Sequence, residues 1–554
     1  MRWLRGAARV IGRLAVAAET RWGAVAVFIA GLTVWWVQAY AMPLAGGRDF
    51  GTYVGAYVEL FQSDPIDLGY VLGRTPVAPL VVGVVLDIAG GALAEPAVSL
   101  LYAASVTAWF LAARTFGGAA GLLVAVVLLA YPSYGILFHE LSSDTVFAAA
   151  FAGWSLLLVR VLLRPTTAGF ALVGAGVALL VLVRPGNQAL LVLAALPLLL
   201  PLSWRSRLSA ATAFVVCAVG LLGAWTVHNG IRFGDYTVAR GGNSRLPFER
   251  VYLTERIVRP ENGPASRRLA EAVERELLSE EPYRSYGIGL EDFFADPSPR
   301  MKEDLGALAI RLDGWESDER LLRDVGIEAV RAHPGPYVRG VSTTAWDLLR
   351  LSVFRPLDMG GNASGAAPAG SVGQDEPGDT IVVGGKALPR PTEGERIPAP
   401  HEGGPTTPDR SIYTVWTSPT EHHLVFVHEG DAERHAALHR RISELSSNLP
   451  TREGNATLAL RLNQSSRWFP PPVLWLALGV IGLAIRRPLN ALAMSTPAIA
   501  ACIVIVLSAL AIAAIPHYSV PVTPAFLLLG SGGLLAPRRT KRHAQSGSPD
   551  PSTR

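Results

Sequence analysis

The sequence predicts an all-α protein that crosses a membrane many times and carries one long polar insert. Its 554 residues have a mean hydropathy of +0.32, and only 17% of them are charged. That composition is too apolar for an ordinary soluble enzyme. Apolar runs of the roughly 20 residues needed to cross a hydrocarbon core of about 30 Å recur along the chain.

We expect about 10 to 11 membrane helices from these runs. They lie at 22–42, 76–94, 96–114, 117–136, 145–163, 167–183, 187–203, 208–227, 470–485, 491–515 and 518–536. The runs form an N-terminal membrane module (22–227, with a first outer loop at 43–75) and a C-terminal group (470–536). Basic segments 1–21 and 537–554 flank them. The first of these lacks a small-residue cleavage site, so we expect it to be a retained cytoplasmic segment.

Basic residues orient the chain, because Lys and Arg accumulate in short cytoplasmic loops. Placing the basic clusters inside a bacterial cell membrane leaves both termini cytoplasmic and three regions outside: the Asp49 loop, residues 138–144 and the insert 228–469. Three apolar runs separate the first two of these regions, and three crossings would place them on opposite sides. We therefore expect one run in 76–136 to be re-entrant or too short to cross.

The insert divides into two parts by composition. Residues 228–356 contain charged, helix-like stretches and are expected to fold. Residues 357–412 are rich in Gly, Pro, Ala and acidic residues, which bury too little apolar surface to offset ordering entropy. We expect that second part to be a mobile loop.

Several classes of function are disfavoured. Cys217 and Cys502 lie in apolar runs, which argues against a disulfide framework or a thiolate metal site. The basic residues gather at the ends of the runs rather than in a stripe with aromatics, so nucleic acid is not an expected partner. Neither a Walker nor a dinucleotide fingerprint follows a predicted strand, which argues against nucleotide-driven transport.

Polar residues cluster at the outer ends of the apolar runs, beginning with Asp49 just after the first run. A carboxylate at a membrane surface is costly and marks a candidate site. A partly desolvated acid can act as a general base, and an arginine can hold a phosphate. The candidates are Arg48, Asp49, Tyr53, Arg74, His139, Glu140, Asp144, Arg184, His228, Asn229, His517 and Tyr518.

Structural roles are open alternatives for these residues. Asp49 could cap a short surface helix, and Ser142-Ser143-Asp144 could form a helix N-cap. Arg184 precedes a proline at a membrane boundary, where arginines snorkel. Interfacial histidines are more often structural than functional.

The order of motifs resembles the GT-C membrane glycosyltransferases, which include protein O-mannosyltransferases and aminoarabinose transferases. The matching pieces are Asp49 with Tyr53, Pro76-x-x-Pro79-Leu80, the acidic second loop with Glu140 and Asp144, Arg184-Pro185, Trp225-x-x-His228-Asn229-x-x-Arg232-Phe233-Gly234, His333-Pro334-x-x-Tyr337 and Pro516-His517-Tyr518-x-x-Pro521-x-x-Pro524. The resemblance implies that Asp49 is the catalytic base. This chain has a single acid in its first loop, where several members carry two, and His517 where relatives commonly have Arg.

We therefore expect a GT-C-like inverting glycosyltransferase with a polyprenyl-phosphate sugar donor and a glycan, lipid or protein acceptor. No tight cluster of metal ligands is evident, which favours a metal-independent site, and a divalent cation held by one acid and the donor phosphate stays open. The rival hypothesis is a non-catalytic transporter of lipid-linked precursors or an envelope-assembly scaffold. A third hypothesis is a polymerase or ligase that acts on diphosphate-linked glycans.

Overall fold

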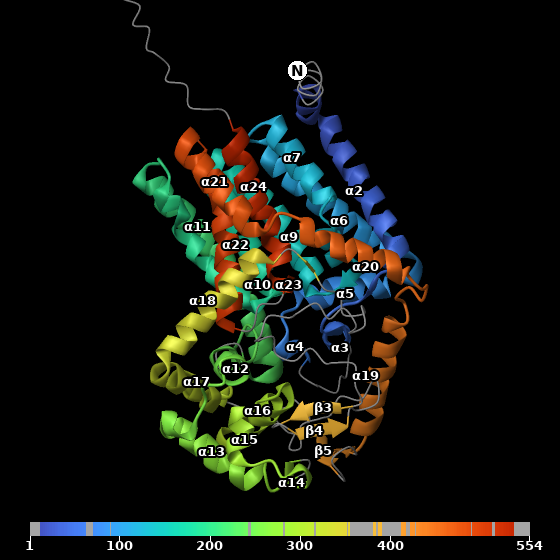
Figure 1. Cartoon of the computed structure of the whole chain (residues 1–554), viewed down its shortest axis with the longest axis vertical. Helices are drawn as coiled ribbons and strands as arrows, with labels where there is room; N and C mark the ends of the chain where they lie inside the picture. The colour runs from blue at the N-terminus through green and yellow to red at the C-terminus, as the bar shows by residue number, and fades with distance from the viewer. Residues whose placement is uncertain are drawn as a thin grey trace, which may run out of the picture.

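The computed structural model describes a bundle of membrane helices joined to a polar, mostly helical unit at one end (Figure 1). The described residues are 12–61, 70–88, 90–241, 245–280, 283–314, 317–351, 353–354, 380–383, 386–389, 412–416, 422–426, 428–488, 490–511 and 516–536.

The chain is a multi-pass membrane protein. Among the residues described above, seven helical segments are long and apolar enough to cross a membrane. They are α2 (Arg21–Ala41), α6 (Gly90–Arg114), α9 (Ser143–Leu163), α11 (Trp204–Phe233), α22 (Ala491–Ala511), and the segments Ala456–Arg486 (α20, Ala456–Ser465, with α21, Pro472–Arg486) and His517–Leu535 (α23, Pro516–Ser519, with α24, Thr523–Leu535).

Four further apolar elements complete the bundle. α7 (Gly118–Leu129) is followed, after a bend of 69°, by α8 (Pro132–Ile136) and η1 (Leu137–His139), and this pair makes an eighth span if counted as one. Three shorter apolar helices are α5 (Val77–Asp87), α10 (Thr167–Val183) and the 3₁₀ helix η2 (Pro185–Leu199). The predicted all-α polytopic class is confirmed.

The region 76–136 explains how two loops reach the same end of the bundle. α5 has 11 residues, about 16 Å of helix, which is too short for a core of about 30 Å. Arg114 in α6 donates to the carbonyls of Ala18 (3.2 Å) and Thr20 (2.8 Å) near the start of α2. Trp35, nearer the end of α2, donates to the carbonyl of Phe138 (3.1 Å). α6 therefore crosses the bundle antiparallel to α2, and the chain returns through α7 to the end of α2. The segment expected to be too short to cross is α5.

The predicted boundary between runs 76–94 and 96–114 is wrong. Pro96 lies inside α6 rather than between two helices. The break comes earlier, where Gly90 begins α6 with a φ of +60°. Glycine adopts that left-handed conformation without a Cβ clash, so the turn into α6 falls at Gly90.

Small residues let the membrane helices approach closely, as expected where lipid offers no hydrophobic drive for association. A Cβ on Gly482 of α21 would lie 2.4 Å from the carbonyl carbon of Gly533 in α24. A Cβ on Gly174 of α10 would lie 2.3 Å from the carbonyl oxygen of Phe214 in α11. These close crossings hold together the helices that frame the polar residues.

Buried residues between 248 and 329 of the insert form a hydrophobic core of their own, whereas Leu348 of the insert belongs to the core of the bundle. The elements of the insert up to residue 350 are α12 (Arg245–Glu249), the π-helix η3 (Arg250–Thr254), η4 (Pro260–Asn262), α13 (Pro264–Glu276), α14 (Tyr283–Tyr286), α15 (Leu290–Ala295), α16 (Pro299–Asp313), α17 (Arg320–Ala332) and α18 (Pro334–Arg350). Leu321, Leu322 and Val325 on one face of α17 are buried in the insert's own core.

The predicted mobile stretch 357–412 lies mostly outside the described residues. Within it, β3 (Thr380–Val383) pairs antiparallel with β4 (Lys386–Pro389). β5 (Ile412–Trp416) pairs in the same way with β6 (His422–Phe426). The composition argument does not anticipate the β3–β4 pair, because Thr380–Val383 is a short β-branched run in a stretch dominated by Gly and Pro.

Arg250 joins the insert to the bundle. Its side chain is fully buried and donates to the carbonyl of Ala509 near the end of α22. It also donates to Glu255 (2.5 Å) and to the Thr344 hydroxyl on α18 (3.1 Å). A buried guanidinium satisfied in this way fixes where the insert sits on the membrane helices.

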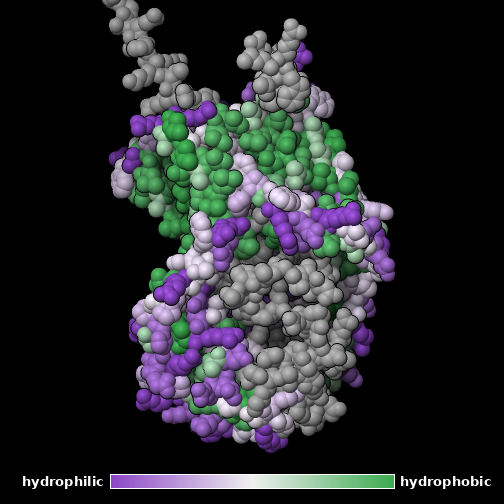
Figure 2. Space-filling view, in the orientation of Figure 1, coloured by the Kyte–Doolittle hydropathy of each residue, from purple (hydrophilic) through white to green (hydrophobic). Residues whose placement is uncertain are grey.

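The polar loops and the insert lie at one end of the bundle, away from the start of α2 and the end of α24 (Figure 1). Apolar side chains cover the bundle and hydrophilic ones cover the insert (Figure 2). α3 (Phe50–Phe61) and α4 (Tyr70–Gly73) follow the first loop at the insert end.

We expect cysteine labelling in intact cells to place the first loop and the insert on the same, outer side. The probes are Gly51→Cys, at an open position beside Asp49, and the exposed Ser279→Cys in the insert, with Cys217 and Cys502 first replaced by Ala. Arg205→Cys, at the start of α11, is the matched probe for the opposite side. Opposite labelling of residues 51 and 279 would overturn the orientation.

Candidate functional site

Two short strands join the first polar loop to the second. β1 (Ala45–Gly46) pairs parallel with β2 (Glu140–Leu141), and the N–H of Gly47 donates to the Leu141 carbonyl (3.3 Å). A Cβ on Gly47 would lie 2.8 Å from the Cβ of Ser142 and 2.9 Å from that of Glu140. Glycine is required here because the two backbones touch.

Gly47→Ala is expected to separate the two loops and to lower both thermal stability and any transfer activity. The added methyl meets two Cβ atoms, neither of which is the free end of a flexible side chain. Gly51→Ala is the matched control, since a Cβ at that position meets nothing within 4 Å. Equal stability and activity of the two variants would show that the loops are not held together here.

Asp49 lies between the loop and α3 in a left-handed conformation, with a φ of 59°. Its carboxylate makes an ion pair with Arg74 (Nη2–Oδ2 3.1 Å), and each side chain is 35% exposed. The Arg74 guanidinium also lies over the ring of Tyr53, 5.6 Å from its centroid. The backbone carbonyl of Asp49, rather than its side chain, receives the Tyr53 N–H (3.0 Å). A side-chain helix cap is therefore not what places this acid.

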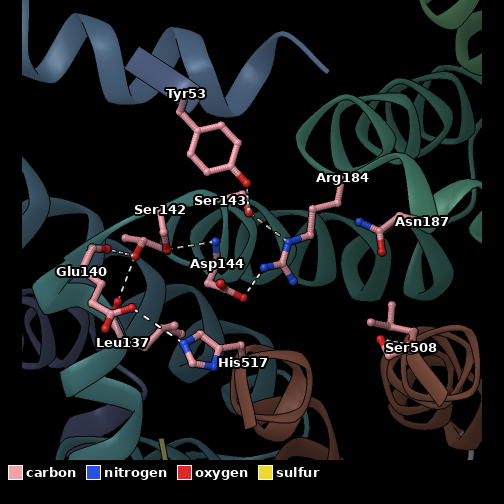
Figure 3. Close-up of polar contacts among 12 residues, drawn as sticks. Tyr53, Leu137, Glu140, Ser142, Ser143, Asp144, Arg184, Asn187, Ser508 and His517 are labelled. Atoms are coloured by element: carbon pink, nitrogen blue, oxygen red, sulfur yellow. Dashed lines mark hydrogen bonds and ion pairs between the residues drawn. The ribbon is translucent and has the colours of Figure 1, made fainter. Parts of the chain in front are cut away.

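The side chains of Tyr53, Ser143, Arg184 and Asp144 form a connected polar chain (Figure 3). Tyr53 donates its hydroxyl to Ser143 Oγ (2.8 Å), and Arg184 Nε donates to the same oxygen (3.3 Å). Arg184 Nη2 pairs with the Asp144 carboxylate. Burial raises the pKa of the Tyr53 phenol, so it stays protonated and acts as the donor.

Arg184 also contacts two aromatic rings. Its guanidinium carbon lies over the ring of Phe147, 5.4 Å from the centroid, and over that of Tyr518, 5.7 Å from the centroid. The Arg184 side chain is 18% exposed and that of Asp144 is 4% exposed. The arginine therefore points into the protein rather than snorkelling to the surface. Ser142, not Asp144, caps α9, through the Asp144 N–H (3.2 Å).

Tyr518 links the two loops electrostatically. The charges of Arg184, Asp144, Arg48 and Asp49 all act on its hydroxyl. Arg48, a half-buried neighbour of Asp49, is thereby placed close to the second half of the site. The site draws its members from the first loop, the start of α9, the end of α10, and α23.

A second, deeper pair lies beside this chain. His517 Nε2 is 3.8 Å from Glu140 Oε2, and both side chains are 4% exposed. The His517 ring also packs against Phe354 (4.4 Å). His139 stacks on Trp35 of α2, with centroids 4.5 Å apart and planes 16° apart. Glu140 and His517 therefore meet, whereas His139 is packed against the first span.

His228 and Asn229 lie at the end of α11 and bond locally. His228 is exposed and stacks on Trp225 (5.0 Å). Asn229 is buried and donates to the Thr237 carbonyl (2.8 Å), while Trp225 donates to that of Val238 (2.9 Å). These contacts shape the chain as it leaves the membrane. They do not connect either residue to the cluster, so the binding role of both stays a prediction.

Ser143 and Gly47 are site residues that the sequence did not single out. Ser143 was assigned to a cap, yet its hydroxyl accepts from both Tyr53 and Arg184. The paired glycines Gly46-Gly47 just before Asp49 were the available signal, because glycine often marks a close backbone approach.

The arrangement can accept a proton and hold an anion. The Asp49 carboxylate, which is 35% exposed, is paired with Arg74, and Arg184 is fixed nearby by Ser143 and Asp144. In the described part of the chain, no three His, Cys, Asp or Glu side chains gather as metal ligands. A cation shared between Asp49 and a bound phosphate stays open as predicted.

No protein-family model matches the chain, and no curated protein matches it. Two solved structures of ArnT from Cupriavidus metallidurans are similar to it, both at 15% sequence identity. The one bound to undecaprenyl phosphate has a TM-score of 0.33 over 93% of this chain and 78% of that chain. The apo structure has a TM-score of 0.29 over 92% and 77%. A functional assignment therefore rests on this chain's own residues.

Proposed function

We propose that this protein is an inverting membrane glycosyltransferase that moves a sugar from a polyprenyl-phosphate donor to an acceptor hydroxyl outside the cell membrane. The observation that carries the proposal is the placement of Asp49. A half-exposed acid is paired with Arg74 and adjoins a buried Arg184–Asp144 network, where the membrane helices meet a polar insert. A lipid-linked anionic donor and a hydrophilic acceptor can meet at such a boundary.

Asp49 is the proposed general base. It takes the proton of the acceptor hydroxyl as the oxygen attacks the anomeric carbon, on the face opposite the departing phosphate. A polyprenyl phosphate leaves without protonation, so one acid is sufficient, unlike the pair in a glycosidase.

Arg74 and Arg48 are the proposed contacts for the donor phosphate. Arg74 is paired with Asp49 in the free protein. Because both side chains are partly exposed, that ion pair is weak and can be exchanged. A phosphate that attracts Arg74 would release the carboxylate to act as a base, which ties activation of the acceptor to the presence of the donor.

Arg184 is proposed to bind phosphate from a fixed position. Its Nε and Nη2 are engaged by Ser143 and Asp144. The two N–H groups of Nη1 and the second N–H of Nη2 are the donors left to bind the donor phosphate. The insert is proposed to shape the acceptor side, with a glycan, lipid or protein as acceptor.

The main alternative is a transporter of lipid-linked precursors or an assembly scaffold. Many transporters are built from two matched halves. Here the apolar segments divide unequally around the insert, with eight before it and three after it in the sequence, which favours an enzyme. A ligase acting on diphosphate-linked glycans differs only in its leaving group.

Purified protein supplied with a panel of radiolabelled polyprenyl-phosphate sugars tests the proposal. We expect one donor to be consumed, with release of polyprenyl phosphate. Consumption of diphosphate-linked donors alone would favour the ligase. Failure to consume any donor would favour the transporter or scaffold.

A further inference from the structure

Helix α19 (Asp431–Ser446) carries His435 and His439, one turn apart on the same face. Their Nε2 atoms are 3.0 Å apart, their ring centroids are 4.2 Å apart and their planes make an angle of 50°. The surrounding sequence is rich in the same residue, since five of the chain's 11 histidines fall within 422–439. The Asp49 cluster uses none of them.

The spacing of the two Nε2 atoms suits a shared metal ion. With metal–nitrogen bonds of about 2.0–2.1 Å, two ligands at a right angle lie about 2.9 Å apart, and two ligands of a tetrahedron lie about 3.3 Å apart. The observed 3.0 Å lies between these values. Imidazole nitrogen is a preferred ligand of zinc, copper and nickel.

Lowered pKa values favour the neutral form of both rings, which is the form that binds a metal ion. Burial lowers the pKa of His435 to about 4, with the neighbouring His439 adding to the effect. Burial also lowers the pKa of His439. Neutral imidazoles at pH 7 bind a cation without first losing a proton.

The pair is also accessible. His439 is exposed and His435 is half-buried, with Phe426 packed edge-on against its ring (5.4 Å). In the described part of the chain no group of three ligand residues forms, so water would fill the other positions.

The position on α19 suggests what an ion would do. The later part of α19 is anchored: Arg441 pairs with Asp87 of α5 (2.6 Å), and Asn448, just beyond the helix, donates to the Leu86 carbonyl (2.9 Å). His435 and His439 lie just before that anchor. An ion bridging them would fix the preceding turn of α19 to the anchored part.

We propose that His435 and His439 bind one divalent transition-metal ion, which stiffens α19 where it packs beside α3 and α5. This site is separate from the proposed transfer reaction. The proposal of a metal site holds whether or not the chain is a glycosyltransferase, because neither histidine belongs to the Asp49 cluster.

The test is metal titration of the full-length protein, purified in detergent without a polyhistidine tag and stripped of metal. Zn²⁺ and Ni²⁺ are added separately, with calorimetry and the thermal-unfolding midpoint as readouts. We expect one ion per chain and a rise in the midpoint with concentration, as for any ligand that binds the folded state. His435→Ala and His439→Ala should each weaken binding by about tenfold or more, because loss of even an outer-shell partner costs about 10–100-fold.

Two further variants exclude simpler explanations. His439→Gln can still hydrogen bond to His435 but is a poor ligand, so it should lose metal binding as His439→Ala does. His333→Ala removes a histidine that bonds to Asn262 (3.2 Å) elsewhere in the insert, and it should bind metal like wild type. The proposal is overturned if wild type takes up no ion, or if His435→Ala/His439→Ala binds one ion as tightly as wild type.

Discussion

Replacing Asp49 by Asn is expected to slow sugar transfer by on the order of 10²-fold or more, with expression and donor binding nearly unchanged. Asparagine keeps the size and hydrogen bonding of the side chain but removes the basic lone pair. It also tolerates the left-handed backbone at this position, with its φ of 59°, so the substitution adds no strain. The loss should therefore fall on the chemical step, and it is measured as kcat with the preferred donor.

Asp87→Asn is the matched control for that experiment. Asp87 is also a loop-side carboxylate paired with an arginine, at 2.6 Å from Arg441, and it is 34% exposed against 35% for Asp49. The Asp87 carboxylate also accepts a hydrogen bond from the hydroxyl of Tyr57 (3.0 Å), which lies on α3, the helix that follows Asp49. The substitution removes a partly exposed ion pair that contributes little to stability, so turnover should stay near normal.

Near-normal turnover by Asp49→Asn would remove the catalytic assignment. Equal loss in the Asp49 and Asp87 variants would point instead to a general need for charge around α3. If the wild-type protein turns over no donor, the transporter or scaffold hypothesis is favoured, whatever the variants do.

The membrane helices could be predicted because hydropathy is a local property of the sequence. Runs of apolar residues located α2, α9, α11 and α22, and loop parity predicted that one segment in 76–136 would not cross. The helix boundary at Gly90 was missed, because the left-handed φ of that glycine becomes visible only in the structure.

The pairing of the site residues could not be predicted, because it joins residues distant in sequence. Ser143 looked like a helix-cap residue until Tyr53, 90 positions earlier, was seen to donate to it. Arg184 was a candidate phosphate contact, with snorkelling to the membrane surface as the alternative. The structure instead gives it a carboxylate partner 40 positions away. Each side chain has a plausible local role, and only the fold decides which role it takes.

Breaking the Arg184–Asp144 pair is expected to have the largest effect on stability. Removing one partner leaves the other charge buried and uncompensated, which costs about 3–5 kcal/mol, whereas replacing both partners by apolar residues is often neutral. Arg184→Ala should therefore lower the thermal-unfolding midpoint strongly, in addition to weakening donor binding. Asp144→Leu alone should be similarly unstable, because it leaves the Arg184 side chain, which is only 18% exposed, without its carboxylate partner.

The double variant Arg184→Met/Asp144→Leu separates the two roles of the arginine. It should regain most of the lost stability, because no buried charge is left alone, and it should still bind donor poorly, because the phosphate contact is gone. Unfolding midpoints and donor affinities of wild type, Arg184→Met, Asp144→Leu and the double variant form a complete cycle that isolates the pairwise coupling. If the double variant is as unstable as either single variant, the stability comes from packing against Phe147 and Tyr518 rather than from charge compensation. If it instead binds donor like wild type, Arg184 holds the site together and does not contact phosphate.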